Sequence, residues 1–439
     1  MKRISAQTLI LFITGFALCQ ASKTAPSLQA LVPLIEQNIK NHPIYEYCSN
    51  SSPEDFFKLL AHAAPIKPSD DYRHAAPSEI IAIAAGHEHN RIAAYDVGST
   101  GTRVTIADVN ICDPNQFKVI GYLSISTPFE ITHETIPHRL LLYQEIKNCI
   151  DSLYSSGTQP VFHYARATAG FRNAGELGVE LAMKIRTVSG INFKVAQQEK
   201  EGWFSYESVA KTIANAPEEL VVWDVGGGSI QVTTQEAGRY VTLGSSYASR
   251  SIIPIINAEV KKIKTLNEPL FPMSLGQIQQ ALSIVSELNV HGSYEAYTNK
   301  NSFLKNAQAA KLILDRIHNT GTVYGVGDFH HRSMRKYVAP ANNHYTRAQV
   351  KALLLELADL TQTQAQDLLD GHEDPFFKYL LSDLILAYST MQTLGISKVN
   401  TLAVDNGIGL VHLGHQKLLN TSTPHECSTQ SWDGSCTAN

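Results

Sequence analysis

The sequence is poor in three features that mark particular classes of protein: cysteine, long apolar runs and an excess of one charge. It has 6 cysteines in 439 residues, with no Cys-x-x-Cys pair and no Cys/His spacing typical of a zinc site. No stretch of about 18 or more apolar residues occurs, which excludes an ordinary transmembrane helix. Lysine and arginine (36) nearly balance aspartate and glutamate (40), for a net charge of −4. This balance disfavours a nucleic-acid partner bound through a basic face.

What is present is the composition of a globular protein. Hydrophobic residues make up 44% and charged residues 17% of the chain, which is typical of folded rather than disordered sequences. The length suffices for two or three domains with large cores, so folding does not depend on disulfides. His330 and His331 are adjacent but lack a matching ligand spacing, so we expect both on the surface.

The first 21 residues have the layout of a secretory signal peptide. A positive start at residues 2–3 precedes an apolar run at 9–18, and the triplet 19–21 has small residues at both ends. A lipoprotein signal is the weaker alternative, because Leu18 is bulky where a small residue is needed. We therefore expect cleavage after Ala21 and a secreted or periplasmic protein.

Beyond the signal, apolar periodicity predicts an α/β chain. Residues 22–90 are expected to form a helical leader. Strands are predicted at 92–95, 104–109, 117–125, 161–165, 193–196 and 401–404, and helices at 140–153 and 175–189, with further apolar helical stripes at 278–288 and 350–360. The alternation of strands and helices favours α/β architecture.

An internal repeat is the most informative feature of the sequence. Residues 93–105 (AAYDVGSTGTRVT) align without a gap with residues 221–233 (VVWDVGGGSIQVT). Each copy is an apolar strand ending in an aspartate, a glycine-rich loop and a second strand. Two such copies one domain apart predict two similar domains that face each other across a cleft.

Both loops of the repeat are suited to phosphate. Their glycines let successive backbone N–H groups approach an anion closely. Asp96 and Asp224 are poorly placed to touch phosphate and are better suited to hold a hydrated divalent cation. Hydroxyl groups can add further donors: Ser99, Thr100, Thr102 and Ser229.

Two segments between the loops carry further candidates. Residues 165–172 (ARATAGFR) lead from a strand into a helix, and the Thr168 hydroxyl and the Arg172 guanidinium can face phosphate there. In residues 197–206 (QQEKEGWFSY), Glu201 precedes a glycine and two aromatics. It is a candidate general base, because hydrolysis of a phosphoanhydride needs an in-line water that a carboxylate deprotonates or orients.

These motifs resemble those of the actin/sugar-kinase/chaperone ATPase superfamily, and more closely its phosphoanhydride hydrolases. The apyrase (nucleoside triphosphate diphosphohydrolase) branch has the motifs D-x-G-S-T-G-[ST]-R, A-T-A-G-[MF]-R, E-G-x-[FY]-G-W and D-x-G-G-[AG]-S-x-Q. Four segments of this sequence match them in order: 96–103, 167–172, 201–206 and 224–231. Gln231 matches the final glutamine of the fourth motif, whereas Ser205 and Tyr206 depart from the Gly and Trp of the third motif.

The exopolyphosphatase/guanosine pentaphosphate phosphohydrolase branch is similar as well. Residues 200–209 resemble its E-E-A-R-L-x-Y-x-G-V motif, and residues 350–411 resemble its closing helix-strand-turn region. Its first loop carries an asparagine where Thr100 stands. The choice between the two branches stays open at the level of sequence.

The resemblance spans roughly residues 91–415 and implies a fold. It implies two actin-like (RNase H-like) α/β domains with mixed sheets, facing each other across a phosphate-binding cleft. The expected boundaries are 91–205 for the first domain and 206–415 for the second, followed by a tail at 416–439.

The resemblance also implies a role for each site residue. Glu201 resembles the catalytic base, and Ser229 and Gln231 resemble residues that position the attacking water. Asp96 and Asp224 resemble carboxylates that hold Mg²⁺ or Ca²⁺ through water. The remaining matches resemble the phosphate cradle: Ser99, Thr100, Gly101, Thr102, Arg103, Thr168, Ala169, Arg172, Gly226, Gly227 and Gly228.

The function expected from these motifs is a secreted, divalent-cation-dependent hydrolase of terminal phosphates on nucleoside tri- or diphosphates. An activated water would attack directly, with no covalent intermediate. The alternatives are an exopolyphosphatase or guanosine pentaphosphate phosphohydrolase and, from another class, a nucleotide-binding protein or kinase of the same fold. Export favours the first, because polyphosphate pools are mainly cytosolic. Apyrases clamp the base with an aromatic ring. Four residues are candidates for this role, although a core or surface position is favoured for each: Tyr324, Phe329, Tyr337 and Tyr345.

Overall fold

The computed structural model describes residues 89–98, 101–111, 113–126, 131–155, 160–213, 219–294, 297–298, 303, 306–320, 323–404 and 406–419. The expected signal peptide (1–21) and all but the end of the expected leader (22–90) lie outside the described residues. So do the chain beyond residue 419 and all of the cysteines except Cys149, which is buried.

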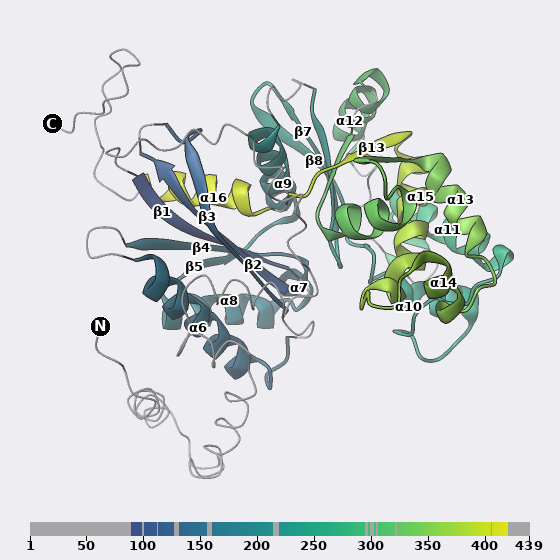
Figure 1. Cartoon of the computed structure of the whole chain (residues 1–439), viewed down its shortest axis with the longest axis horizontal. Helices are drawn as coiled ribbons and strands as arrows, with labels where there is room; N and C mark the ends of the chain where they lie inside the picture. The colour runs from purple at the N-terminus through teal and green to yellow at the C-terminus, as the bar shows by residue number, and fades with distance from the viewer. Residues whose placement is uncertain are drawn as a thin grey trace, which may run out of the picture. The chain divides into compact units, whose positions relative to one another are not determined.

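The first sheet has five strands in the order β3-β2-β1-β4-β5 (Figure 1). Their bounds are β1 (His89–Val97), β2 (Gly101–Asn110), β3 (Phe117–Ser126), β4 (Val161–Ala167) and β5 (Asn192–Val195). Strands β1, β2 and β3 form an antiparallel meander, and β4 and β5 run parallel to β1. The central strand β1 is apolar and buried along most of its length, as expected for a strand whose sheet is covered on both faces.

Helices cover both faces of the first sheet. Helices α6 (Ile136–Tyr154) and α8 (Glu176–Ser189) lie on one side and α16 (Gly407–Leu419) lies on the other (Figure 1), while the short α7 (Ala169–Asn173) follows β4. Pro137 stands in the first turn of α6, where its missing N–H costs nothing. Helix α8 ends at Gly190, whose φ of 73° lies in the left-handed region that glycine adopts without strain. Of the helices in the described residues, none has the length and apolar character needed to cross a membrane.

The second sheet has six strands in the order β12-β13-β11-β6-β7-β8. Their bounds are β6 (Val221–Val225), β7 (Ile230–Glu236), β8 (Arg239–Ser245), β11 (Val323–Val326), β12 (His344–Thr346) and β13 (Lys398–Thr401), and a separate two-stranded ribbon consists of β9 (Ser293–Tyr294) and β10 (Tyr297–Thr298). Strands β6, β7 and β8 are antiparallel, β11 and β13 run parallel to β6, and β12 is an antiparallel edge strand.

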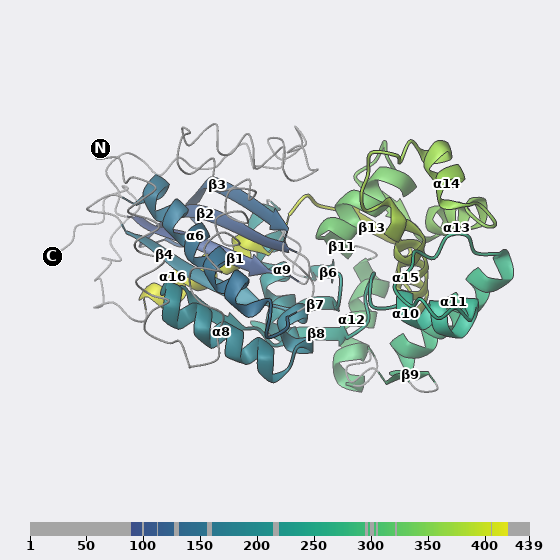
Figure 2. The same cartoon turned by 90° about the horizontal axis from the view of Figure 1, so that it is seen from below.

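The helices that follow α8 belong mainly to the second half of the chain. They are α9 (Gln198–Thr212), α10 (Ile253–Ile256), α11 (Leu275–Val290), α12 (Ala307–Thr320), α13 (Arg347–Glu356), α14 (Gln362–Leu369) and α15 (Leu380–Thr393), with the π-helices η1 (Asn257–Lys261) and η2 (Phe329–Val338) and the 3₁₀-helix η3 (Phe377–Tyr379). Helices α11, α13 and α14 each begin with a capping box, in which a serine or threonine and a glutamine satisfy each other's backbone N–H groups. Helix α15 packs against α11 and α13 (Figure 2) and is buried along most of its length.

The two sheets share one topology. The order β3-β2-β1-β4-β5 of the first corresponds to β8-β7-β6-β11-β13 of the second, with the same strand directions throughout. The turns of the two hairpins close alike: Gly98 N donates to Gly101 O at 2.8 Å, and Gly226 N donates to Ser229 O at 3.0 Å. The internal repeat inferred from the sequence is therefore confirmed, and the chain has the expected α/β fold with two mixed sheets.

Helix α16 returns from the second sheet to the first. It follows β13 of the second sheet, yet it packs on β1, β2 and β4 and along α9. Gly409 permits this contact, because a Cβ there would lie 2.2 Å from the backbone oxygen of Phe204 in α9. Residues 407–415, which the sequence-based boundaries place in the second domain, thus form part of the layer over the first sheet.

Two local predictions are wrong. Strand β13 runs from Lys398 to Thr401, so the strand expected at 401–404 begins earlier in the chain; Leu402 N still donates to Gly325 O at 3.0 Å, but the regular pairing ends at Thr401. His330 is not on the surface: it is fully buried, with Nδ1 2.9 Å from Tyr345 Oη, and burial lowers its pKa to about 3. It is a neutral core histidine.

Candidate functional site

Glu201 lies in the first turn of α9, and this turn is fastened to the second sheet. Gln198 Nε2 donates to the backbone oxygen of Ile230 in β7 at 3.1 Å. Gly202 lets the turn sit directly on the sheet, because a Cβ there would lie 2.2 Å from Thr233 Oγ1. The Glu201 side chain is consequently held beside β7 and is only 7% exposed.

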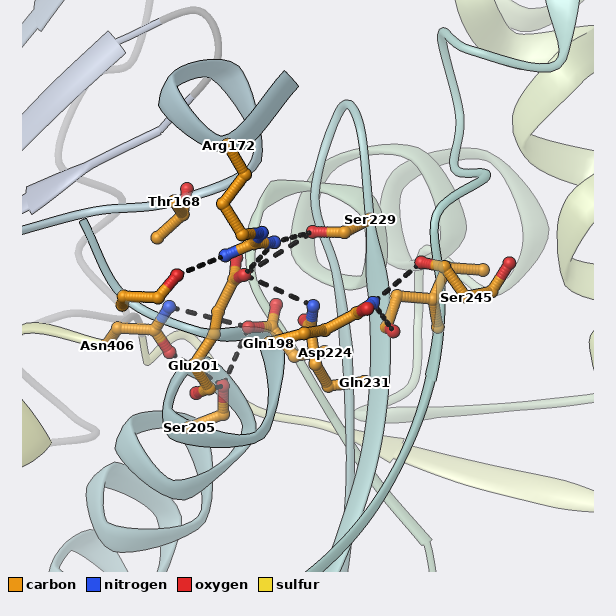
Figure 3. A network of polar contacts seen from close by, with 12 residues as sticks. Thr168, Arg172, Gln198, Glu201, Ser205, Asp224, Ser229, Gln231, Ser245 and Asn406 are labelled. Atoms are coloured by element: carbon orange, nitrogen blue, oxygen red, sulfur yellow. Dashed lines mark hydrogen bonds and ion pairs between the residues drawn. The ribbon is translucent and has the colours of Figure 1, made fainter. Parts of the chain in front are cut away.

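Three donors converge on one carboxylate oxygen of Glu201 (Figure 3). Arg172 Nη2 lies 2.7 Å from Glu201 Oε2, Gln231 Nε2 lies 3.2 Å from it, and Ser229 Oγ lies 3.4 Å from it. Arg172 Nη2 also donates to Ser229 Oγ at 3.1 Å. The expected base, both expected water-positioning residues and one expected phosphate-binding arginine therefore meet at one point.

The two carboxylate oxygens of Glu201 differ in their hydrogen bonds. Oε2 accepts every one of these hydrogen bonds, and within the described part of the chain no group donates to Oε1. The guanidinium of Arg172, itself fixed by a 2.9 Å bond to the backbone oxygen of Ala196, compensates the buried charge. A carboxylate held rigidly through one oxygen can accept a proton from water at the other.

Asp224 is a second buried carboxylate, at the end of β6. Ser205 Oγ lies 2.6 Å and Asn406 Nδ2 lies 3.4 Å from Asp224 Oδ2. Burial, followed by the negative charge of Glu201, raises the pKa of Asp224 to about 7, although the two hydrogen bonds and the charge of Arg103 act in the opposite direction. The site thus contains two carboxylates in each other's field, and a cation would relieve that repulsion.

Asp96 and Asp224, the two residues expected to hold a hydrated divalent cation, occupy equivalent positions in the two sheets. Both are buried. Each is the second-to-last residue of its strand, β1 or β6, and the first glycine of the turn follows two residues later. In the described ranges no group of three or more His, Cys, Asp and Glu side chains is arranged to bind a metal. Binding through water, as is common for Mg²⁺ beside phosphates, therefore stays the expectation for these two carboxylates.

Ser205→Ala is expected to shift the pH at which the site binds a divalent cation. The Ser205 hydroxyl lowers the pKa of Asp224, so its loss leaves a more basic carboxylate that holds its proton to higher pH. Cation binding needs the ionised form, and we expect the midpoint of Mg²⁺ or Mn²⁺ binding against pH to rise by about 1 unit, the worth of one charged hydrogen bond. Calorimetric titration from pH 5.5 to 8.5 measures it.

The matched control is Thr212→Ala, which removes another hydroxyl of α9 that is bonded to the preceding turn of the helix. It should leave the midpoint unchanged. An equal shift in both variants, or a downward shift in Ser205→Ala, would contradict the role given to Ser205.

The expected phosphate-binding residues differ in what their side chains contact. The amide and hydroxyl of Thr168 both donate to the backbone oxygen of Val97, at 2.9 and 3.2 Å, which ties the start of α7 to the first loop. The Thr102 hydroxyl lies 2.9 Å from Tyr143 Oη inside the first domain, so any phosphate contact of Thr102 falls to its backbone. Arg103 forms an ion pair with Asp328 of the second half of the chain. Ser99 and Thr100 lie outside the described residues.

Three of the aromatic residues considered as a nucleotide clamp belong to the core. Phe329, Tyr337 and Tyr345 are all buried and pack in the large cluster around the second sheet. Tyr324 is half-buried beside the small cluster of Val209 and Val326. None of the three core rings is available to stack on a nucleobase.

Sequence motifs did not reveal two residues of this site, Asn406 and Asp328. Asn406 reaches Asp224 from the turn before α16, and Asp328 reaches Arg103 from the turn after β11. The sequence did carry a signal for Asp328. This residue follows an apolar strand and a glycine, and polar residues of the site also lie at the ends of the apolar strands β1 and β6. Asn406 carried only the weaker signal of a polar residue between a strand and a helix.

Comparisons with known proteins yield structural similarity alone. No family model and no curated protein sequence matches the chain. A Ppx/GppA family member from Aquifex aeolicus is similar in structure, with a TM-score of 0.54 and 16% identity over 76% of this chain and 100% of that one. An exopolyphosphatase from Cytophaga hutchinsonii gives a TM-score of 0.52 and 13% identity over 75% of this chain and 98% of that one.

A third solved structure, of an exopolyphosphatase-like protein, gives a TM-score of 0.52 and 13% identity over 76% of this chain and 99% of that one. The similarity covers nearly the whole of each of these proteins, so it concerns both halves of the fold and their connection. The chain accordingly has the two-domain actin-like fold found in the Ppx/GppA structures.

Proposed function

We propose that the protein hydrolyses terminal phosphoanhydride bonds and that Glu201 is the general base. The observation that carries the proposal is the convergence of Arg172, Ser229 and Gln231 on one oxygen of Glu201, beside the second of two repeated glycine-rich turns. A structural ion pair would explain Arg172 alone. It would not explain why Ser229 and Gln231, which flank the end of the second glycine-rich turn, donate to the same buried carboxylate oxygen.

In this proposal each residue has a defined task. Glu201 Oε1 takes a proton from the attacking water, while Ser229 and Gln231 orient that water together with the carboxylate. Backbone N–H groups of the two turns and the guanidinium of Arg103 stabilise charge on the phosphoryl oxygens. A divalent cation held through water by Asp96 and Asp224 would neutralise further charge there. Attack by water needs no covalent intermediate.

For the substrate, we propose a linear polyphosphate or a guanosine pentaphosphate ahead of nucleoside triphosphates. Solved structures that share the fold include a protein described as an exopolyphosphatase and one of the Ppx/GppA family. The core positions of Phe329, Tyr337 and Tyr345 remove the most evident candidates for a nucleobase clamp, which favours linear polyphosphate, the substrate that has no nucleobase. Nucleoside tri- and diphosphates remain the second candidate, favoured by the match of Gln231 and its neighbours to the apyrase motifs. Export through residues 1–21 is a further part of the proposal and is tested by N-terminal sequencing of the mature protein.

Phosphate release from a panel of substrates tests the proposal directly. With Mg²⁺ present, we expect kcat/KM for polyphosphate or guanosine pentaphosphate to exceed that for ATP, GTP or ADP by at least about tenfold. EDTA should abolish release from every substrate, because charge at the phosphoryl oxygens is then uncompensated.

Two other outcomes would be decisive. Faster release from nucleotides than from polyphosphate would establish the apyrase-type reaction instead. Tight binding of nucleotides with no release of phosphate, or phosphate transfer to an added acceptor, would contradict hydrolysis and favour a binding protein or a kinase.

A further inference from the structure

A cluster of positive charge surrounds Asp328, which lies two residues beyond the end of β11. Asp328 is 48% exposed and forms an ion pair with Arg103. Against the desolvation of this carboxyl, the charges of Arg103, Arg332, His331 and Arg250 hold the pKa of Asp328 below its usual value. One carboxylate therefore stands among three guanidinium groups.

The fold brings these residues to one place. Strand β11 lies beside β6 with Val326 opposite Asp224, and the chain then turns at Gly327, whose φ is 86°. A Cβ at Gly327 would lie 3.2 Å from Asp224 Oδ1, so only glycine turns here without strain or crowding. The next residue, Asp328, is thereby presented at the edge where β6 ends, and Arg103 reaches it from β2 of the first sheet.

Arg250 lies against the second glycine-rich turn itself. Its backbone N donates to Gly227 O at 3.2 Å, and a Cβ at Gly227 would lie 3.6 Å from Arg250 Cδ. The Arg250 side chain thus lies against the second glycine-rich turn.

Aromatic rings hold two of the three guanidinium groups. Arg332 Cζ lies 4.1 Å from the ring centre of Phe376, and Arg250 Cζ lies 4.6 Å from that of Tyr379. A guanidinium stacked on a ring keeps the N–H groups at its edge for an anion. In the described ranges no carboxylate lies within 4 Å of either guanidinium, so their charge is not cancelled by an ion pair.

A buried carboxylate fixes the backbone that carries both arginines. Asp383 in α15 accepts hydrogen bonds from Ser249 and from Ser333, which directly precede and follow Arg250 and Arg332 in the sequence. The two arginines are therefore parts of one braced structure and not independent surface side chains.

We propose that Arg250 and Arg332 form a second anion-binding site, which takes a phosphate group of the substrate remote from the bond that is cleaved, and that the Asp328 carboxylate, paired with Arg103, occupies this site when substrate is absent. The proposal rests on the proposed function for its substrate class, a chain of at least three phosphates. Three cations around one carboxylate leave a net positive charge that a chain of phosphates, with at least one negative charge on each group, matches better than the single carboxylate does. Substrate would displace Asp328 and release Arg103 from its ion pair.

Binding of inorganic tripolyphosphate in the presence of EDTA tests the site without hydrolysis. Arg250→Gln and Arg332→Gln should each weaken binding about tenfold, the usual effect of losing one charged hydrogen bond. Asp328→Asn should tighten binding several-fold, because the competing carboxylate is gone. This gain cannot arise from misfolding. The matched controls are Lys351→Gln and Glu356→Gln on the exposed surface of α13, which change the same charges elsewhere and should leave binding unchanged.

The outcomes separate this site from the proposed reaction. Weaker binding in both arginine variants together with tighter binding in Asp328→Asn supports the site, even if no substrate is hydrolysed and the proposed function fails. If polyphosphate is hydrolysed, Arg332→Gln should raise KM with little change in kcat. Unchanged tripolyphosphate binding in the arginine variants, or weaker binding in Asp328→Asn, would overturn the site while leaving the role of Glu201 intact.

Discussion

Replacing Glu201 by glutamine is expected to lower the rate of phosphate release by about 10³-fold, in the middle of the range that a general base contributes. Glutamine has nearly the same shape, and its amide oxygen can still accept the hydrogen bond from Arg172. It cannot take a proton from water. Initial rates with polyphosphate and Mg²⁺ measure the effect, and circular dichroism with thermal unfolding establishes that the variant is folded.

Glu199→Gln is the matched control. Glu199 lies two residues earlier in the first turn of the same helix and is exposed, so its replacement changes the net charge equally without touching the site. Its activity should equal that of the native protein. A Glu201→Gln variant that keeps more than a tenth of the native rate would contradict the mechanism.

Gly409→Val is expected to lower stability strongly, by about 3 kcal/mol or more in the free energy of unfolding. A Cβ at this position would lie 2.2 Å from the backbone oxygen of Phe204, and backbone in a packed helix pair cannot move aside cheaply. The approach is tight because Gly409 N also donates to Ser208 Oγ in α9 at 2.8 Å. Denaturation by urea or heat measures the loss.

The same variant should lower activity, because α16 begins just after Asn406, whose side chain touches Asp224. Gly276→Ala serves as control: it lies in the first turn of α11, where a Cβ would meet nothing closer than 4.0 Å. We expect less than about 1 kcal/mol of change there. Equal unfolding free energies for the two variants would show that α16 does not pack closely on α9.

The features that could be predicted from the sequence are contiguous in it. The repeat places an aspartate, a glycine-rich turn and a second strand within about a dozen residues, and such a unit folds into a hairpin through its own register. The positions of Asp96 and Asp224 at the ends of equivalent strands followed from the repeat alone. Glu201 was identified because a short motif marks it, although its helix needs Gln198 and Gly202 to reach the sheet.

The features that could not be predicted depend on which face of an element meets the rest of the chain. Thr102 and the clamp candidates Phe329, Tyr337 and Tyr345 have the right chemistry for a site, but the structure turns them inward. A one-residue change of register would have turned Thr102 outward. Nothing local in the sequence decides between the two.

The sequence by itself determined the two glycine-rich hairpins, the α/β class and the candidate base, because each depends on neighbouring residues, on strand and helix periodicity or on a short motif. Only the tertiary structure decided what surrounds them: Asn406 and Ser205 on Asp224, Asp328 on Arg103, and α16 packed across the first sheet. These contacts join residues that lie far apart in the chain. They depend on how the two sheets, α9 and α16 pack together. A short stretch of sequence therefore does not specify them.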